Sequence, residues 1–212
     1  MKLLKILPFL LIFHLSIDIK VNAQTKFPND KNFKYSSDSL LLAAGINHPD
    51  FKTVDFEMRY WLRSSLHTFA HELFIVQLLK DSTWHLTHYQ ICFNEEKTRY
   101  DIISKKDSVL NNWTDRWHVL LTFNILTLPD ASIVRKNWKT NDGFFCTIGD
   151  GDYVHIELVT KKHKHGYLYD NPQDYLKDYG SKFEELVNIN KIIVMLDSSF
   201  NFDYSKRCRC EQ

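Results

Sequence analysis

The sequence predicts an α+β domain built on a single antiparallel sheet of about six to seven strands, with two main helices packed on one face. The first observation is a set of three apolar or alternating runs at 144–148, 153–159 and 167–169, separated by Gly/Asp and Lys/His/Gly clusters. Alternation broken by such clusters is typical of strands joined by tight turns. The second observation is apolar residues at three- and four-residue steps over 107–128 and 181–197, which predict amphipathic helices.

The first half of the chain supplies the other predicted strands. Residues 54–63 alternate between an apolar set and a mostly charged set, and we expect a strand with one buried face. The apolar set is Phe56, Met58, Tyr60 and Leu62, and the opposite set is Glu57, Arg59, Trp61 and Arg63. Residues 71–79 and 84–93 are separated by a polar turn and predict a hairpin. A further strand is expected over 98–104.

The two main helices carry start and stop signals. Asp107 or Ser108 can cap the first helix, and Pro129 disfavours a helical conformation at the residue before it. Ser181 and Glu184 have the spacing of a capping box, in which each side chain satisfies an amide of the other residue. We therefore expect helices over 107–128 and 181–197.

Two shorter helices are also predicted. The first covers 40–44, and Gly45 can adopt the left-handed conformation that closes it. The second begins at Asn171 and Pro172, where Asn is a good N-cap and Pro suits the first helical position, and it ends at Gly180.

The N-terminus has the pattern of a signal peptide over residues 1–23. A basic segment is followed by the apolar run 6–17, and Val21-Asn22-Ala23 offers a cleavage site after Ala23. The alternative is a membrane anchor, but the run is shorter than the ~20 apolar residues that span a bilayer, and Asp18 and Lys20 end it. We expect a periplasmic or extracellular protein with no membrane span after cleavage. Residues 24–212 would form one domain with a loose N-terminal arm and a cysteine-containing C-terminal tail.

The charge of the mature chain is close to balanced. Loss of the leader reduces the 27 Lys and Arg to 24 and the 26 Asp and Glu to 25. A balance near neutrality gives no overall field for nucleic acid or anionic lipid. We therefore expect no nucleic-acid partner, and we expect a protein, a glycan or a small molecule instead.

Four cysteines follow the leader: Cys92, Cys146, Cys208 and Cys210. An oxidising compartment permits disulfides, and four cysteines allow three pairings. One hypothesis is a pair of bridges that tie the polar tail to the sheet. The alternative is that Cys92 and Cys146 are small buried apolar residues.

The candidate metal ligands are His67, His71 and Glu72, although the pattern predicts neither a metal nor another cofactor. On a helix, His67 and His71 would share a face, as zinc-binding pairs do. The Glu does not lie between two histidines, however, and the segment after it has the pattern of a strand. His85 and His88 lie three apart in one predicted strand, so they should point to opposite faces.

A second candidate surface combines His155 and Glu157 on one strand with Tyr167 and Tyr169 on the next. If the register brings the two pairs together, they form an aromatic face capable of acid–base chemistry, with Trp61 as a further exposed aromatic. The alternative is a cross-strand ladder that only stabilises the sheet.

The basic tip Lys161–His165 could bind an acidic surface or an anionic glycan, but such a tip also serves simply as a solvated hairpin end. No nucleophile elbow, phosphate-binding loop or dinucleotide fingerprint occurs in the chain. The sequence therefore fixes no reaction.

Four segments resemble those of exported bacterial proteins of no assigned function: Val21–Gln24, Phe56–Trp61, Asp152–Glu157 and Tyr167–Pro172. The resemblance implies a Gram-negative envelope or secreted setting and no activity. We expect a non-enzymatic domain that binds a ligand or partner. One alternative is a cell-envelope hydrolase, with or without a metal, that uses His67, His71, Glu72 or His155 with Glu157. The other is a structural or assembly protein.

Overall fold

The computed structural model describes residues 28–30, 38–65, 70–136 and 151–210. Within these ranges, six strands form one open antiparallel sheet in the order β4-β3-β2-β1-β5-β6. The strands are β1 (Val54–Ser64), β2 (His71–Leu79), β3 (Trp84–Asn94), β4 (Arg99–Val109), β5 (Asp152–Thr160) and β6 (Lys164–Asp170). The predicted α+β class with a single antiparallel sheet is confirmed. The predicted strand at 144–148 and the proposed leader lie outside the described residues.

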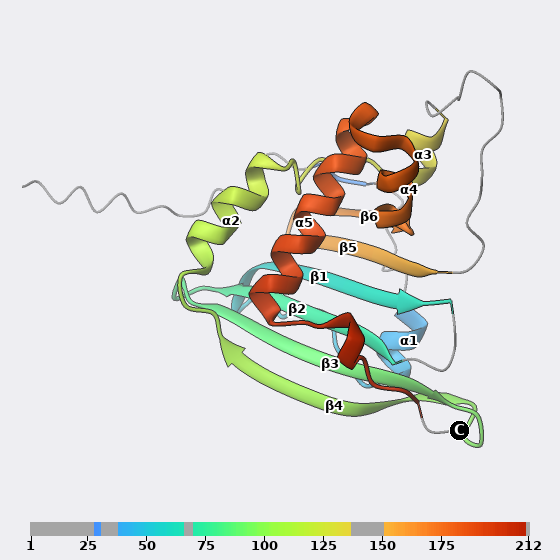
Figure 1. Cartoon of the computed structure of the whole chain (residues 1–212). Coiled ribbons are helices and arrows are strands. Elements are labelled where there is room, and N and C mark those ends of the chain that lie inside the picture. Colours follow the sequence, from blue (N-terminus) through green and yellow to red (C-terminus); the bar gives the residue numbers. More distant parts are fainter. Residues whose placement is uncertain (1–27, 31–37, 66–69, 137–150, 211–212) are drawn as a thin grey trace, which may run out of the picture.

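The main helices cover one face of the sheet. The helices are α1 (Asp38–Ala43), α2 (Trp113–Thr122), α3 (Ala131–Arg135), α4 (Pro172–Tyr179) and α5 (Glu184–Phe200). Figure 1 shows α5 crossing the strands on one face, while α1 lies on the opposite face. No helix in the described ranges has the length and hydrophobicity needed to cross a membrane.

The larger core lies between the sheet and helices α2 and α5. The alternation in β1 places Phe56, Met58, Tyr60 and Leu62 on this face, as predicted. Phe56 packs on Trp117 of α2 with ring centroids 5.0 Å apart. These aromatic contacts explain why the apolar stripe of α2 faces the sheet.

The prediction that β1 has only one buried face is wrong. A second core, which includes Leu41 of α1, Trp61 and Ile75, covers the opposite face. Glu57 and Arg59 are buried there as a pair, with Arg59 Nε 2.6 Å from Glu57 Oε1. A central strand covered on both faces retains its alternation, but the charged set is buried in an ion pair instead of facing solvent.

Helix α2 (Trp113–Thr122) is shorter than the helix predicted over 107–128. Strand β4 continues to Val109, and Thr87 on β3 donates a hydrogen bond to Asp107 Oδ1 over 2.6 Å. Asp107 therefore serves as a cross-strand partner and not as a helix cap. Tertiary pairing here overrides a helical pattern, which leaves α2 with Trp113, Trp117 and Leu120 as its buried side.

The predicted caps of the last two helices are confirmed only in part. Ser181 lies in a short 3-10 turn, and α5 starts at Glu184 with Phe183 at the N-cap and no side-chain cap, so the predicted capping box does not form. Asn171 does occupy the N-cap of α4, and Gly180 ends that helix, as predicted. Asn171 has a positive φ of 43° and makes no side-chain cap bond.

A disulfide joins Cys210 of the tail to Cys92 of β3. The prediction that a bridge ties the tail to the sheet is confirmed for this pair. Cys208 has a free thiol among the three cysteines that the structure describes, and Cys146 lies outside the described residues.

Candidate functional site

A pocket of about 480 Å³ opens where the end of β1 meets the start of β5. Ser64 is paired with Asp152 across these two strands. The N-terminal end of α4, Ile193 of α5 and the C-terminal tail complete the wall. We call this cavity the Asp152 pocket.

Arg207 fixes the tail beside the Asp152 pocket. Its Nη1 donates to Asp152 Oδ1 over 2.8 Å, its Nη2 donates to the Leu62 carbonyl over 3.1 Å, and its Nε donates to the Ala70 carbonyl over 3.2 Å. The Arg207 side chain is 5% exposed, whereas that of Asp152 is 39% exposed. Arg207 therefore has a structural role, and Asp152 is the member of the pair that remains open to a ligand.

The floor of the Asp152 pocket is held by backbone contacts around Gly151. The Gly151 amide donates to Ser65 Oγ over 2.9 Å, and the Ser65 amide donates to the Gly151 carbonyl over 2.9 Å. A Cβ atom on Gly151 would overlap the side-chain amide of Asn171. The glycine is thus required by the close approach of two chain segments. The hydrogen bond from the Gly151 amide keeps the Ser65 hydroxyl in place.

A partly buried acid lies behind the Asp152 pocket. Tyr60 donates a hydrogen bond to Asp197 Oδ1 over 2.9 Å. Burial raises the pKa of Asp197 to about 7, although hydrogen bonds from Tyr60 and Tyr204 act in the opposite direction. Tyr204 lines the pocket, and Asp197 lies one helical turn beyond the pocket residue Ile193. A carboxyl group that exchanges its proton near neutral pH is therefore connected to the pocket through the Tyr204 hydroxyl.

The expectation of an exposed aromatic face is wrong. Trp61 is 0% exposed, and Tyr167 and Tyr169 are each 1% exposed. The register also separates the two predicted pairs, since His155 lies opposite Leu168 while Tyr167 lies opposite Ile156. The two tyrosines consequently face the α2 and α5 side of the sheet, and His155 and Glu157 face the other side.

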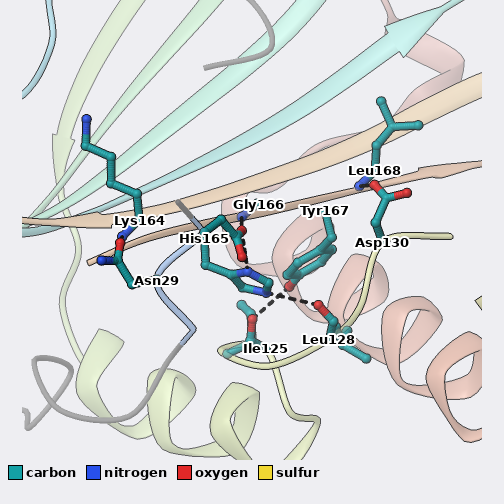
Figure 2. Close-up of polar contacts among 10 residues, drawn as sticks. Asn29, Ile125, Leu128, Asp130, Lys164, His165, Gly166, Tyr167 and Leu168 are labelled. Atoms are coloured by element: carbon teal, nitrogen blue, oxygen red, sulfur yellow. Dashed lines mark hydrogen bonds and ion pairs between the residues drawn. The ribbon is translucent and has the colours of Figure 1, made fainter. Parts of the chain in front are cut away.

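Both tyrosines hold the chain segment that follows α2. Tyr167 donates to the Ile125 carbonyl and Tyr169 donates to the Pro129 carbonyl, each over 2.9 Å. Figure 2 shows Tyr167 beside His165 in this polar cluster. Each hydroxyl donates to a backbone carbonyl, so the two tyrosines have a structural role.

The end of the basic tip is part of the same cluster. His165 is buried, with its Nδ1 2.8 Å from Asp30 Oδ2 and its Nε2 donating to the Leu128 carbonyl over 3.0 Å (Figure 2). Lys161, Lys162 and Lys164 remain exposed. The predicted basic surface therefore keeps its three lysines and loses His165.

His155 and Glu157 lie on the second face, and both are buried. Glu157 Oε1 is 3.6 Å from His155 Nδ1, which is too long for a strong hydrogen bond. Burial, reinforced by the Arg63 guanidinium, lowers the pKa of His155 to about 3. His155 is therefore neutral at physiological pH, where it would be a poor general acid.

The candidate metal ligands do not converge. His71 and Glu72 are neighbours on β2 and point to opposite faces, while His67 lies outside the described residues. Glu72 Oε2 instead lies 2.6 Å from His88 Nε2. His85 and His88 point to opposite faces, as predicted. Over the described ranges, no group of three or more His, Cys, Asp or Glu side chains is placed to hold a metal ion.

Sequence reasoning did not identify Asp197, Tyr204 or Arg207 as site residues. Asp197 occurs near the end of a helix with a broad apolar face, and only its position at the four-residue step from Ile193 could have indicated that it faces the core.

Neither a scan against models of protein families nor a search of curated proteins finds a match to this chain.

Proposed function

We propose that the chain is an exported ligand-binding domain whose binding site is the Asp152 pocket. The observation that carries the proposal is a sugar-sized cavity whose polar groups are held by backbone and ion-pair contacts. Ligand sites in proteins are typically concave, largely preformed and lined by a few fixed polar groups among apolar ones. The signal-peptide pattern in the sequence of residues 1–23 is the reason to expect export.

The wall of the pocket favours an uncharged, hydroxyl-rich ligand. Its polar groups are the carboxylates of Asp152 and Asp174, the amides of Asn171 and Gln173, and serine hydroxyls. The two carboxylates disfavour an anionic ligand. Arg207, the cation in the wall, does not offset them because it already donates to Asp152. Acceptors and donors in alternation suit the hydroxyl groups of a monosaccharide or another polyol, and the Tyr204 ring and Ile193 offer apolar contact.

The test is binding of a panel of neutral monosaccharides and disaccharides, measured by saturation-transfer NMR and by calorimetry. Gln173 is exposed on the rim of the pocket, so Gln173→Trp should fill the cavity without disturbing the core. Asp178→Trp places the same side chain on an exposed position of α4 away from the pocket and is the matched control. We expect at least a tenfold loss of affinity with Gln173→Trp and little change with Asp178→Trp. Equal effects of the two variants, or no binding by any member of the panel, would contradict the proposal.

A second candidate is a hydrolase, and the pKa of Asp197 near 7 is the observation that favours it. A general acid or base works best when its pKa lies near the working pH. Asp197 reaches the Asp152 pocket through Tyr204, whereas the residues first considered for catalysis, His155 and Glu157, are buried on the other face. Turnover of chromogenic glycosides or esters that is lost in Asp197→Asn, with ligand binding retained, would establish this alternative.

A further inference from the structure

A second cavity, of about 780 Å³, is lined by the three cysteines that the structure describes. Cys92 and Cys210 form the disulfide, and Cys208 has a free, half-buried thiol. Arg209 lies between the two tail cysteines and also lines this cavity. We call it the cysteine pocket, and it is separate from the Asp152 pocket.

The tail lies beside β3, where Cys208 contacts Gln90 and Cys210 is bonded to Cys92. Gln90 and Cys92 are two positions apart on β3 and share one face of it, and Cys208 and Cys210 are two positions apart in the tail. Gln90 Nε2 lies 3.2 Å from Cys208 Sγ, and Cys92 is bonded to Cys210. The free thiol is therefore held one residue pair away from the disulfide.

Gln90 is itself positioned by a buried acid. Its Nε2 lies 3.3 Å from Glu72 Oε1, and Glu72 Oε2 lies 2.6 Å from His88 Nε2. Glu72 is fully buried, so this chain of contacts fixes the amide that faces the Cys208 sulfur. A sulfur that carries negative charge during a reaction would thus have an N–H donor directed at it.

We propose that Cys208, Cys210 and Cys92 form a thiol–disulfide exchange site in which Cys208 is the internal nucleophile. The Cys208 thiolate attacks Sγ of Cys210, and a Cys208–Cys210 disulfide forms as the bond between Cys210 and Cys92 breaks. The electron pair of the broken bond leaves with Cys92 as a thiolate, which takes up the proton that Cys208 released. The number of disulfides is unchanged, and no external oxidant or reductant is consumed.

The anchoring of the tail allows this exchange within the folded protein. The Ala70 amide donates to the Cys208 carbonyl over 3.1 Å, and Arg207 Nε donates to the Ala70 carbonyl over 3.2 Å. Cys208 therefore stays in place when the bridge opens, and only the residues after it need to move. Two residues of extended chain span roughly 6.7 Å, which is at the upper end of the roughly 4.4–6.8 Å between the Cα atoms of a disulfide. A small bend at Arg209 is enough to bring the two tail cysteines into bonding range.

The experiment is disulfide mapping of the purified, oxidised full chain after incubation at pH 8. Samples are quenched with acid, free thiols are alkylated with N-ethylmaleimide, and tryptic peptides are identified by mass spectrometry. Trypsin cleaves after Arg209, so the peptide that carries Cys208 is separated from the one that carries Cys210, and Cys92 lies in a third peptide. The three linkages among these cysteines are therefore distinguishable.

In the wild-type chain we expect the Cys92–Cys210 linkage with alkylated Cys208 at the start. With time, a Cys208–Cys210 linkage with alkylated Cys92 should accumulate, faster at pH 8 than at pH 5 because only the thiolate attacks. Cys208→Ser should keep Cys92–Cys210 intact over the same period, and its thermal midpoint should match that of the wild type before incubation. Gln90→Glu, which puts a carboxylate at the sulfur, should slow the exchange severalfold.

Two results would overturn the proposal. One is that Cys92 remains unalkylated in the wild type over a day at pH 8. The other is that Cys208 is found linked to Cys146 in the purified wild-type chain, since a bonded sulfur is no nucleophile. Wild-type protein is therefore mapped before any cysteine is replaced.

Discussion

The sharpest prediction concerns Asp197, because its raised pKa makes the free energy of unfolding depend on pH with a known sign. The pKa of Asp197 is about 7 in the folded protein, and an exposed carboxyl in the unfolded chain titrates near 4. Between these two values the folded state retains a proton that the unfolded state has lost. The unfolding free energy contributed by this group therefore falls as pH rises, by about 1.4 kcal/mol per pH unit. The contribution is fully present below pH ~4, and the loss is complete above pH ~7.

The total effect over this window is about 4 kcal/mol, which is about three pH units multiplied by that slope. Asp197→Asn keeps the shape and an acceptor for Tyr60 but cannot ionise. We expect the variant to be less stable than or equal to the wild type at pH 4 and more stable than it at pH 8. If the hydrogen bond from Tyr60 is lost in the variant, its unfolding free energy falls by about 1 kcal/mol at every pH, and its dependence on pH is unchanged.

The assay is urea unfolding of wild type and Asp197→Asn at pH 4, 5, 6, 7 and 8. The difference between the two proteins at each pH removes the contributions of every other titrating group that the substitution leaves unchanged. We expect the difference to change steadily from pH 4 to 7 and to level off above it. A difference that is constant across this range, or that favours the wild type increasingly as pH rises, would refute the burial argument.

Three further predictions follow from other contacts. The pKa of His155 is about 3 in the folded protein, below its value near 6.5 when exposed, so the unfolding free energy should fall as pH falls from about 6.5 to 3. His155→Gln should reduce this loss, as measured by acid unfolding curves. Replacing both Cys92 and Cys210 by Ser should lower the unfolding free energy by up to about 5 kcal/mol, because the bridge closes a loop of 118 residues; an unchanged urea midpoint would exclude this entropic contribution. Gly151→Ala should lower the thermal midpoint by several degrees through its overlap with Asn171, and a midpoint equal to the wild type would show that the two segments separate without cost.

The sequence predicted the strands better than it predicted their ends. Residues 71–79 form β2 with the predicted bounds, because a short run of apolar and β-branched residues between polar turns favours a strand over a helix. Residues 107–109 joined β4 because Asp107 found a partner on the adjacent strand, and that partner is not visible in a local pattern. Boundary errors of this kind arise wherever long-range pairing competes with local periodicity.

The candidate site was beyond the reach of sequence patterns for a related reason. Tyr60 and Asp197 are 137 positions apart, and Asp152 and Arg207 are 55 positions apart. Their meeting depends on the strand order and on the path of the tail. The same dependence misled the prediction of an aromatic face, since a shift of one position in register decides whether Tyr167 lies on the side of His155 or opposite it.

The C-terminal tail connects the two sites that the structure suggests. Tyr204 and Arg207 contribute to the Asp152 pocket, and Cys208 and Cys210 contribute to the cysteine pocket. The contacts of Arg207 with the Leu62 and Ala70 carbonyls do not involve the disulfide. An exchange at the cysteines should therefore leave the Asp152 pocket intact, because the tail remains anchored at Arg207. The two proposals are consequently independent, and a failure of disulfide exchange would say nothing against ligand binding at the Asp152 pocket.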